Sequence, residues 1–471
     1  MIGTSDSMKK TFVISFEQLP ACMLGCYGHQ WIETPNFDRL ASLSVLFDQH
    51  FANDLCTAQN SFPWWTGQTI PQALGTQEQN RSSLISHLKK QGIESTLLLE
   101  SDSETGRNAT TRAQEPFFAE FDHVESVAGQ NGFKVSEAET PVAQLMQAAI
   151  DRLPEWMGNT QDQLIWIRSE GVPLEPLAPE FFATLYLDEV LDQGADEDEL
   201  SDETAAAGEL DPLDADDDAE ADDDLETDLD AEDWQELITV VAELFTSPEE
   251  WIELDEHERQ MARVVYAGYV TLLDQWLGRL LDQLLEYAKT QSILLIVTAA
   301  RGGNELLGPD RQVENWGLFE EMSHVPLLIF DSENEEQGNR RQFLSQPADI
   351  PVSLLSWLGV PLEKVSHSGN NLLDVIYDRG PFPEPVIYAA SDRAIALRTA
   401  EFYYLQLRNQ LPTPDAADAT ISNERLEKQL YQKPIDRWDV YEQHAQLPEI
   451  VAQLSAQLDE KRTKHHDQNL S

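Results

Sequence analysis

Short apolar runs alternate with longer segments of helical periodicity along most of this chain. The runs are rich in Val, Ile, Leu and Phe, a composition typical of strands that are buried on both faces. They lie at 11–16, 95–99, 164–167, 293–298 and 325–330. The helical segments lie between them, at about 35–44, 82–91, 138–153 and 258–288. This alternation predicts an α/β fold, a mainly parallel sheet flanked by helices.

Local signals support the ends of these helices. Thr34 precedes Pro35, a favourable pair for the N-cap and the first helical position. Gly92 follows the second helix, and glycine commonly lies just past the end of a helix. The fourth helix is long and has one apolar face, formed by Val264, Val265, Leu272, Leu273, Trp276 and Leu280.

The pattern changes near residue 385. Short strand-like segments follow one another at 386–390, 393–398 and 401–407, and a closing helix is expected at 447–459. These changes predict two domains and a tail. The expected parts are an α/β domain at 8–384, a small C-terminal α+β subdomain at 385–460 and a polar tail at 461–471.

One acidic stretch interrupts the larger domain. Residues 188–236 contain 25 Asp and Glu residues and no Lys or Arg. So little apolar area cannot offset the chain entropy lost on folding, and the composition predicts a disordered, solvated insertion. Calcium buffering or a role in an interaction is the functional alternative, although the stretch has no complete EF-hand loop.

The charge balance restricts the possible partners. Lys and Arg total 31, Asp and Glu total 85, and the net charge is −54. A charge of this sign repels nucleic acid and anionic membrane, so neither is expected as a partner. The start of the chain lacks the apolar core of a secretory signal, and no segment reaches membrane-spanning length. We therefore expect a cytoplasmic protein.

The three cysteines, Cys22, Cys26 and Cys56, do not form the pattern of a disulfide framework. Cys22 and Cys26 could form a metal cluster with His29. Their spacing fits no common zinc pattern, however, and a packing role is favoured.

Five motifs are spread over nearly the whole chain. They are Leu24 to His29 with Thr34 to Ala41, Cys56 to Gly67, Tyr266 to Asp274 with Leu277 to Leu281, Glu320 to Ile329, and Asp349 to Pro361. Their order resembles that of the sulfatase family, in the alkaline phosphatase-like superfamily. The Trp-Trp-Thr-Gly and Val-Thr-Ala-Ala-Arg-Gly variants are similar to those of divergent sulfatase-like proteins of planctomycete-type bacteria. The resemblance implies an alkaline-phosphatase-like sandwich.

The resemblance also implies where calcium would bind. Glu17 and Gln18 end the first strand, and Ala300 and Arg301 end the strand at 293–298, at the positions of the family's metal ligands. Calcium requires several hard, anionic oxygen ligands. These four residues offer one carboxylate and one amide. We therefore expect a vestigial metal site and no cofactor, with Ca²⁺ as the alternative.

The nucleophile motif is altered as well. The family matures a cysteine or serine to formylglycine within Cys-x-Pro-x-Arg, whereas this chain reads Cys-Thr-Ala-Gln-Asn at 56–60. Counting back from Thr66 places Thr57 at the nucleophile position, next to Cys56. A threonine hydroxyl would need a metal to lower its pKa.

The cations that would surround a sulfate group are largely missing. The family's Lys-Trp-His block, its histidine before proline and its late lysine have no counterparts in this sequence. Arg301 is the cation that remains at these positions. We expect it to replace the metal ion and to pair with Glu17, holding the two strand ends together.

Two functions are compatible with these residues. The favoured hypothesis is a pseudoenzyme retained for binding or scaffolding, with a protein or an anionic small molecule as its partner. The alternative is an active hydrolase of sulfuric or phosphate esters that uses Thr57 or Cys56 with a rearranged metal site. Metal bound at Glu17 would favour the alternative.

Overall fold

The computed structural model describes residues 8–53, 62–68, 82–102, 117–172, 178–187, 256–303, 318–334, 337–365, 367–380, 386–390, 394–407 and 428–468. The acidic stretch at 188–236 lies outside these residues, and so do Cys56 and Thr57. Within the described part of the chain, no helix is long and apolar enough to cross a membrane.

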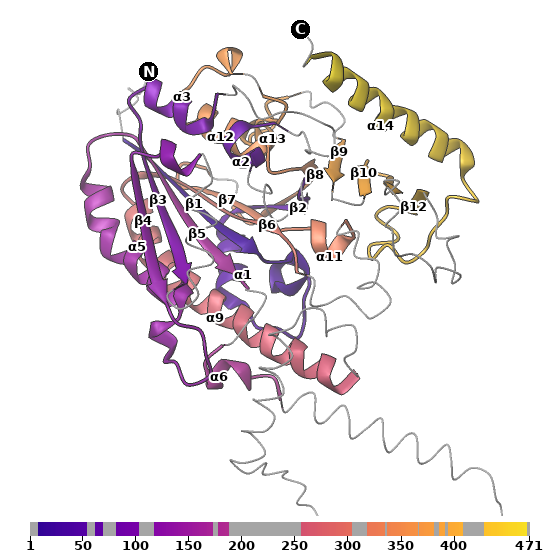
Figure 1. Ribbon diagram of the computed structural model, residues 1–471. Helices are drawn as coiled ribbons and strands as arrows, with labels where there is room; N and C mark the ends of the chain where they lie inside the picture. Colours follow the sequence, from indigo (N-terminus) through magenta and orange to yellow (C-terminus); the bar gives the residue numbers. More distant parts are fainter. Residues whose placement is uncertain are drawn as a thin grey trace, which may run out of the picture.

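The centre of the molecule is an eight-stranded sheet with the order β4-β3-β5-β1-β6-β7-β2-β8 (Figure 1). The strands are β1 (Lys9–Gln18), β2 (Val45–His50), β3 (Glu94–Asp102), β4 (His123–Gly129), β5 (Gln163–Gly171), β6 (Ser292–Arg301), β7 (Leu327–Asp331) and β8 (Asn339–Ser345). Neighbouring strands are parallel except at β7, which is antiparallel to β6 and β2. The predicted α/β fold with a mainly parallel sheet is confirmed.

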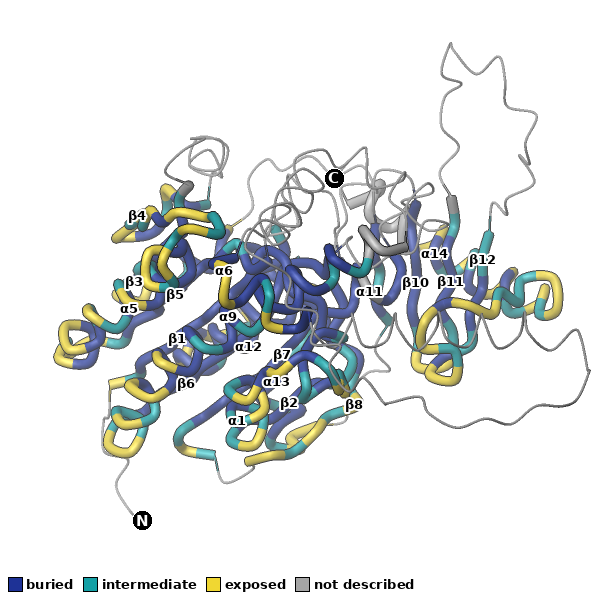
Figure 2. Tube along the Cα trace, turned by 90° about the horizontal axis from the view of Figure 1, so that it is seen from below, coloured by how far each residue is buried: buried dark blue, intermediate teal, exposed yellow. Residues whose placement is uncertain are grey.

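Helices cover both faces of this sheet and enclose two apolar cores. On one face lie α1 (Pro35–Leu43), α5 (Pro141–Gly158), α6 (Glu180–Ala183) and α9 (Glu256–Ala288). On the other face lie α2 (Phe62–Thr66), α3 (Leu84–Lys90), α12 (Asp349–Trp357) and α13 (Leu372–Ile376). Figure 2 shows the central strands buried, whereas α1 and α5 carry exposed segments. Burial on both faces explains why the central strands are continuous apolar runs.

Short helical turns complete the larger domain. They are η1 (Ala21–Met23), η2 (Gly25–Tyr27), η4 (Phe118–Glu120), η5 (Glu137–Glu139), α11 (Glu320–Ser323) and η7 (Leu362–Lys364). Two of them, η2 and α11, contribute residues to the contacts described below.

The C-terminal part forms a four-stranded antiparallel sheet with the order β12-β11-β10-β9. Its elements are β9 (Ile387–Ala390), β10 (Ala394–Arg398), β11 (Phe402–Leu407), β12 (Lys428–Gln432) and α14 (Pro448–Gln468). Leu454 and Leu458 of α14 pack on this sheet. The helix continues to Gln468, so most of the segment expected to be a polar tail is helical.

The family motif from Tyr266 to Asp274 lies in α9 and fixes this helix to α1. Asp274 accepts hydrogen bonds from the backbone N–H groups of Asn36 (3.0 Å) and Phe37 (2.8 Å), at the start of α1. The sequence predicts Thr34 as the N-cap of α1, but its side chain makes no capping hydrogen bond, and its Oγ1 accepts from Gly25 N instead. Asp274 therefore provides the cap from another helix.

The Gly-Cys-Tyr-Gly turn fixes η2 to the sheet. Tyr27 Oη accepts from Leu327 N (2.8 Å) and donates to Phe47 O (3.1 Å), which joins β7 and β2 to the turn. Burial, with the nearby carboxylate of Asp38, raises the pKa of Cys26 to about 12, which favours the packing role over a thiolate ligand. The described residues contain no group of three or more His, Cys, Asp or Glu arranged to hold a metal.

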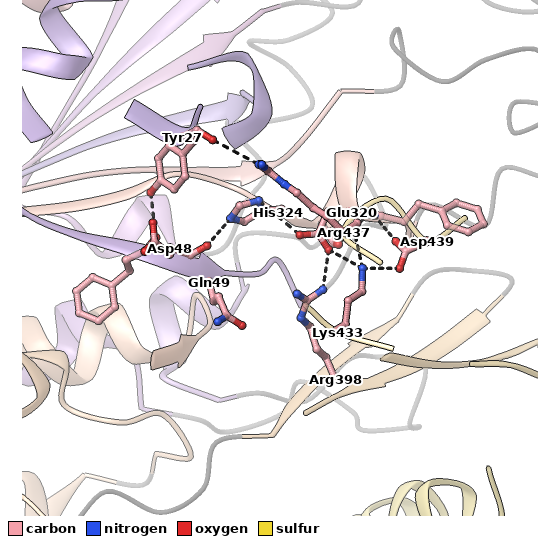
Figure 3. Close-up of polar contacts among 12 residues, drawn as sticks. Tyr27, Asp48, Gln49, Glu320, His324, Arg398, Lys433, Arg437 and Asp439 are labelled. Atoms are coloured by element: carbon pink, nitrogen blue, oxygen red, sulfur yellow. Dashed lines mark hydrogen bonds and ion pairs between the residues drawn. The ribbon is translucent and has the colours of Figure 1, made fainter. Parts of the chain in front are cut away.

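Charged side chains join the two sheets in a buried set that we name the interdomain cluster: Glu320, His324, Arg398, Lys433 and Asp439 (Figure 3). Glu320 Oε2 accepts from Arg398 Nη1 (2.6 Å) and lies 3.3 Å from Lys433 Nζ. Asp439 Oδ1 lies 2.7 Å from Lys433 Nζ, and its Oδ2 accepts from the backbone N of Glu320 (2.9 Å). Two carboxylates therefore balance two cations at the interface.

Candidate active site at the strand ends

Three parallel strands end together where the family resemblance places the metal. Gln18, the last residue of β1, is in register with Gly171 of β5 and with Arg301 of β6. The structure therefore brings Glu17, Gln18, Ala300 and Arg301 to one edge of the sheet, as the sequence predicts. In α/β sheets, ligands commonly bind outside the carboxyl ends of the strands.

The pleat divides these residues between the two faces of the sheet, because successive side chains point to opposite sides. Gln18 and Arg301 are register partners and share the face of Phe16. Glu17 and Ala300 each come one residue earlier and lie on the opposite face. Ala300 is 1% exposed and belongs to the apolar core on that side.

The charge of Glu17 is balanced by Arg168 of β5. Arg168 Nη2 donates to Glu17 Oε2 at 2.6 Å, and the two side chains are 2% and 10% exposed. Arg168 is in register with Ser15, two residues before Glu17 on the same face. Its guanidinium therefore reaches the carboxylate from the neighbouring strand. The guanidinium also lies 5.3 Å from the ring centre of Phe118.

The expected ion pair between Arg301 and Glu17 is not the one that the structure forms. The two residues lie on adjacent strands, but the pleat directs Arg301 to the face of Gln18. Arg301 is 8% exposed, and its Nε has no hydrogen-bond partner in the structure as described.

A second buried carboxylate, Glu100 of β3, lies on the face of Gln18 and Arg301. Its oxygens accept from Ser169 Oγ (2.7 Å) and from the backbone N of Glu170 (2.8 Å). Glu100 is 6% exposed. Its negative charge would oppose an anionic substrate at this end of the sheet.

These residues do not fit a calcium ion held in the manner of the family. Glu17 already has a guanidinium at 2.6 Å, and Ala300 offers only a methyl group. Arg301 would place a second fixed positive charge beside the ion. Calcium takes six to eight oxygen ligands, and the four strand-end positions supply the oxygens of one carboxylate and one amide.

The helix that follows the nucleophile motif, α2, packs under the strand ends. Trp64 and Trp65 are fully buried, and their ring centres lie 5.7 and 4.5 Å from that of Trp166 on β5. Trp166 Nε1 donates to Ser15 Oγ (2.8 Å). These contacts fix the strand segment that carries Arg168. The nucleophile candidates themselves, Cys56 and Thr57, are outside the described residues.

Sequence reasoning missed Arg168, although a signal was present. The buried strand Leu-Ile-Trp-Ile continues directly into this arginine. A charged residue within a buried strand requires a counter-charge. Its partner could be named only once the strand order placed β5 beside β1.

Comparisons with known proteins agree with this architecture. A multifunctional alkaline phosphatase superfamily protein, PehA of Trinickia caryophylli, is 30% identical over 129 residues, which are 27% of this chain and 24% of that protein. The chain thus matches about a quarter of the length of this curated relative.

Two solved structures are similar over almost the whole chain. Phosphonate monoester hydrolase of Agrobacterium radiobacter has a TM-score of 0.64 and 17% identity, over 97% of this chain and 96% of that chain. A protein solved in complex with its substrate D-glucosamine-2-N,6-O-disulfate has a TM-score of 0.66 and 14% identity, over 98% of both chains. At these identities the likeness shows the fold.

The sulfatase family model matches residues 9–360, which include every strand of the large sheet and both halves of the candidate site. Together with the order of its motifs and the sandwich built on β1 and β6, this match shows that the chain belongs to the sulfatase family.

Proposed function

We propose that this sulfatase-family protein does not hydrolyse esters and is retained for binding or scaffolding. The observation that carries the proposal is the pair of side chains at the end of β6. Ala300 and Arg301 lie beside Glu17 and Gln18 of β1, where the family resemblance implies metal ligands. A methyl group and a guanidinium offer no oxygen to a cation.

The remaining charges support the proposal. Transfer of a sulfuryl or phosphoryl group depends mainly on fixed positive charge around its oxygens. Of the two strand-end guanidiniums, that of Arg168 is engaged by Glu17, and that of Arg301 shares its face of the sheet with Glu100. Loss of one preorganised donor typically lowers kcat about 10²- to 10³-fold. Loss of the metal and of several donors would bring the rate close to background.

The partner class follows from charge and from the site. A protein or an anionic small molecule that contacts Arg301 is compatible with the proposal. A net charge of −54 disfavours nucleic acid and anionic membrane. The cytoplasmic location expected from the sequence is part of this proposal.

The test is a metal and activity analysis of the purified full-length protein. Metal content would be measured by mass spectrometry, and turnover would be followed with an aryl sulfate, an aryl phosphate diester and an aryl phosphonate monoester, with and without Ca²⁺. We expect no stoichiometric metal and no turnover above that of a mock purification from cells that lack the protein. Thr57→Ala and Cys56→Ala should leave this background unchanged.

Turnover that disappears in Thr57→Ala or Cys56→Ala would overturn the proposal. It would favour the alternative, an ester hydrolase with a rearranged metal site. Turnover that appears at the same level in the mock purification would identify a contaminating hydrolase and agree with the proposal.

A further inference from the structure

We propose that the apolar loop, residues 435–441 between β12 and α14, is the surface through which two copies of this chain associate. The inference goes beyond the proposed function, because it concerns assembly and lies outside the strand-end site. The loop also lies outside residues 9–360, the part that the sulfatase family model matches.

The apolar loop concentrates the exposed apolar side chains of the molecule. Eight large hydrophobic residues are exposed in the described part of the chain, and four of them lie among these seven consecutive residues. They are Ile435 (81% exposed), Trp438 (40%), Val440 (67%) and Tyr441 (74%). Monomeric proteins rarely expose contiguous apolar patches larger than roughly a few hundred Å², and such patches commonly mark interaction sites.

The backbone of the apolar loop is fixed from the inside. The carboxylate of Asp436 accepts hydrogen bonds from Val440 N (3.0 Å) and from Tyr441 N (2.7 Å). Asp439 is buried, and its carboxylate lies 2.7 Å from Lys433 Nζ. Its φ of 56° is in the left-handed region, which residues other than glycine rarely adopt. The loop thus holds Asp439 inward and Val440 outward, and an interface would require little further ordering.

The charges at the apolar loop favour a second copy of this chain as its partner. Arg437 is exposed, and its guanidinium carbon lies 4.8 Å from the ring centre of Trp438. Glu442 directly follows the loop, so each copy has one cation and one carboxylate beside the apolar side chains. A two-fold axis between two such loops can set the cation of each copy opposite the carboxylate of the other. An isologous interface requires this kind of self-complementary patch.

Strongly charged partners fit the apolar loop less well. Asp436 and Asp439 use their carboxylates within the molecule, so they are not free to bind a strongly basic partner. A strongly acidic partner would be repelled by the net charge of −54. Two copies repel each other for the same reason, but salt screens exposed charges beyond a Debye length of about 8 Å at physiological ionic strength. Association of two copies should therefore become tighter as NaCl is added.

The experiment is sedimentation velocity of the full-length protein over a hundredfold range of concentration, at low and at high NaCl. We expect a reversible equilibrium between monomer and dimer, with a Kd that falls as NaCl rises. Val440→Asp and Ile435→Asp should each raise the Kd at least about tenfold, because they bring a carboxylate into the apolar contact. Both variants should melt at the wild-type temperature, since these side chains are exposed and the loop is held by other groups.

Val124→Asp is the matched control. Val124 is 50% exposed on β4, at the other end of the molecule's large sheet from β8, and the substitution adds the same charge to each copy. This control should form dimers with the wild-type Kd. Tyr441→Ser removes an exposed ring without adding charge and should also weaken the dimer, so it decides the result if an aspartate variant melts at a lower temperature.

A wild type that stays monomeric at every concentration and at both NaCl levels would overturn the proposal. So would a dimer that the loop variants leave intact, or one that Val124→Asp weakens as much as Val440→Asp does. A Kd that rises with NaCl would show a contact driven by charge, and a continuing series of larger species would contradict a closed pair. Sedimentation does not depend on turnover, so ester hydrolysis would overturn the proposed function and leave this inference in place.

Discussion

Buried histidines at the junction of the two domains are held neutral by their surroundings. His50 is fully buried, and its Nδ1 lies 2.9 Å from Ser345 Oγ. Burial, with neighbouring His324, lowers the pKa of His50 to about 3. Burial lowers the pKa of His324 to about 4, against the attraction of Glu320 and with help from Arg398. The imidazole rings of His50 and His324 are therefore neutral in the folded protein near pH 7.

These low pKa values predict that the contribution of His324 to the free energy of unfolding decreases as the pH falls. An unfolded histidine binds a proton below about pH 6.5, whereas folded His324 does so only near pH 4. Its contribution is thus present above about pH 6.5 and is lost as the pH falls through that window. The difference in unfolding free energy between wild type and His324→Gln should fall by about 2 kcal/mol between pH 7 and pH 5.

Chemical denaturation at the two pH values measures this difference. A comparison between variants is needed because burial also raises the pKa of Asp349 to about 7, and a carboxyl with a raised pKa gains stability as the pH falls. A wild-type-to-variant difference that is independent of pH would show that folded His324 titrates like an exposed histidine.

At the scale of elements, the motifs that identify the family join helices and strands. Asp274 of α9 caps α1, and Tyr27 of η2 connects β7 to β2. Gly278 allows α9 to approach α1, because a Cβ at this position would lie 2.3 Å from Asn36 Cγ. These roles require no catalysis, so the motifs can persist when the residues that bind metal have changed.

Loss of the α1 cap should be costly. Asp274→Ala leaves the backbone N–H groups of Asn36 and Phe37 without their acceptor, and we expect it to reduce the free energy of unfolding by about 1–3 kcal/mol. Asp282→Ala is the matched control. Asp282 lies on the same helix and forms an ion pair with Arg39 of α1, but its side chain is 60% exposed. The control should cost less than about 1 kcal/mol in the same urea titration. Equal losses would contradict the capping role.

At the scale of the molecule, the interdomain cluster joins the two sheets through buried charges. Its members come from α11, from β10 and from the segment after β12. Burial alone would raise the pKa of Glu320, but Arg398 beside it holds the pKa of this carboxyl below its usual range. Glu320 therefore stays charged and balances the cations from the C-terminal part.

Neutralising this carboxylate should weaken the attachment of the C-terminal sheet. Glu320→Gln leaves Arg398 and Lys433 with Asp439 as the remaining carboxylate of the cluster, a loss of about 3–5 kcal/mol for a broken buried pair. We expect calorimetry to show an earlier transition for the C-terminal part, separate from that of the large domain. Glu286→Gln, which breaks an exposed pair with Lys289, should leave the profile unchanged. A single transition at the wild-type temperature in Glu320→Gln would contradict this role.

The sequence by itself determined the α/β class and most of the central strands, and it predicted that Glu17, Gln18, Ala300 and Arg301 lie at neighbouring strand ends. Central strands are buried on both faces, and their apolar runs record this directly. Strands β2, β4 and β8 were missed. Strands β4 and β8 are the edges of the sheet, where alternating exposed residues break the apolar run, and β2 has only three apolar residues before Asp48. The sequence could place these four residues together because they follow two apolar runs that the family motifs put in neighbouring strands, and this needs no knowledge of side-chain contacts.

Only the tertiary structure decided how the charges are paired. Arg301 is next to Glu17 in the strand order, yet the pleat turns it to the other face, and Arg168 takes its place from a strand more than a hundred residues away in sequence. The interdomain cluster likewise joins Glu320 to Arg398 and Lys433 across two sheets. Ion pairs depend on distances of a few ångströms in space, and strand order and pleat set those distances. Hydrophobic periodicity predicts which residues are buried, but it does not predict which buried charged residues form ion pairs with each other.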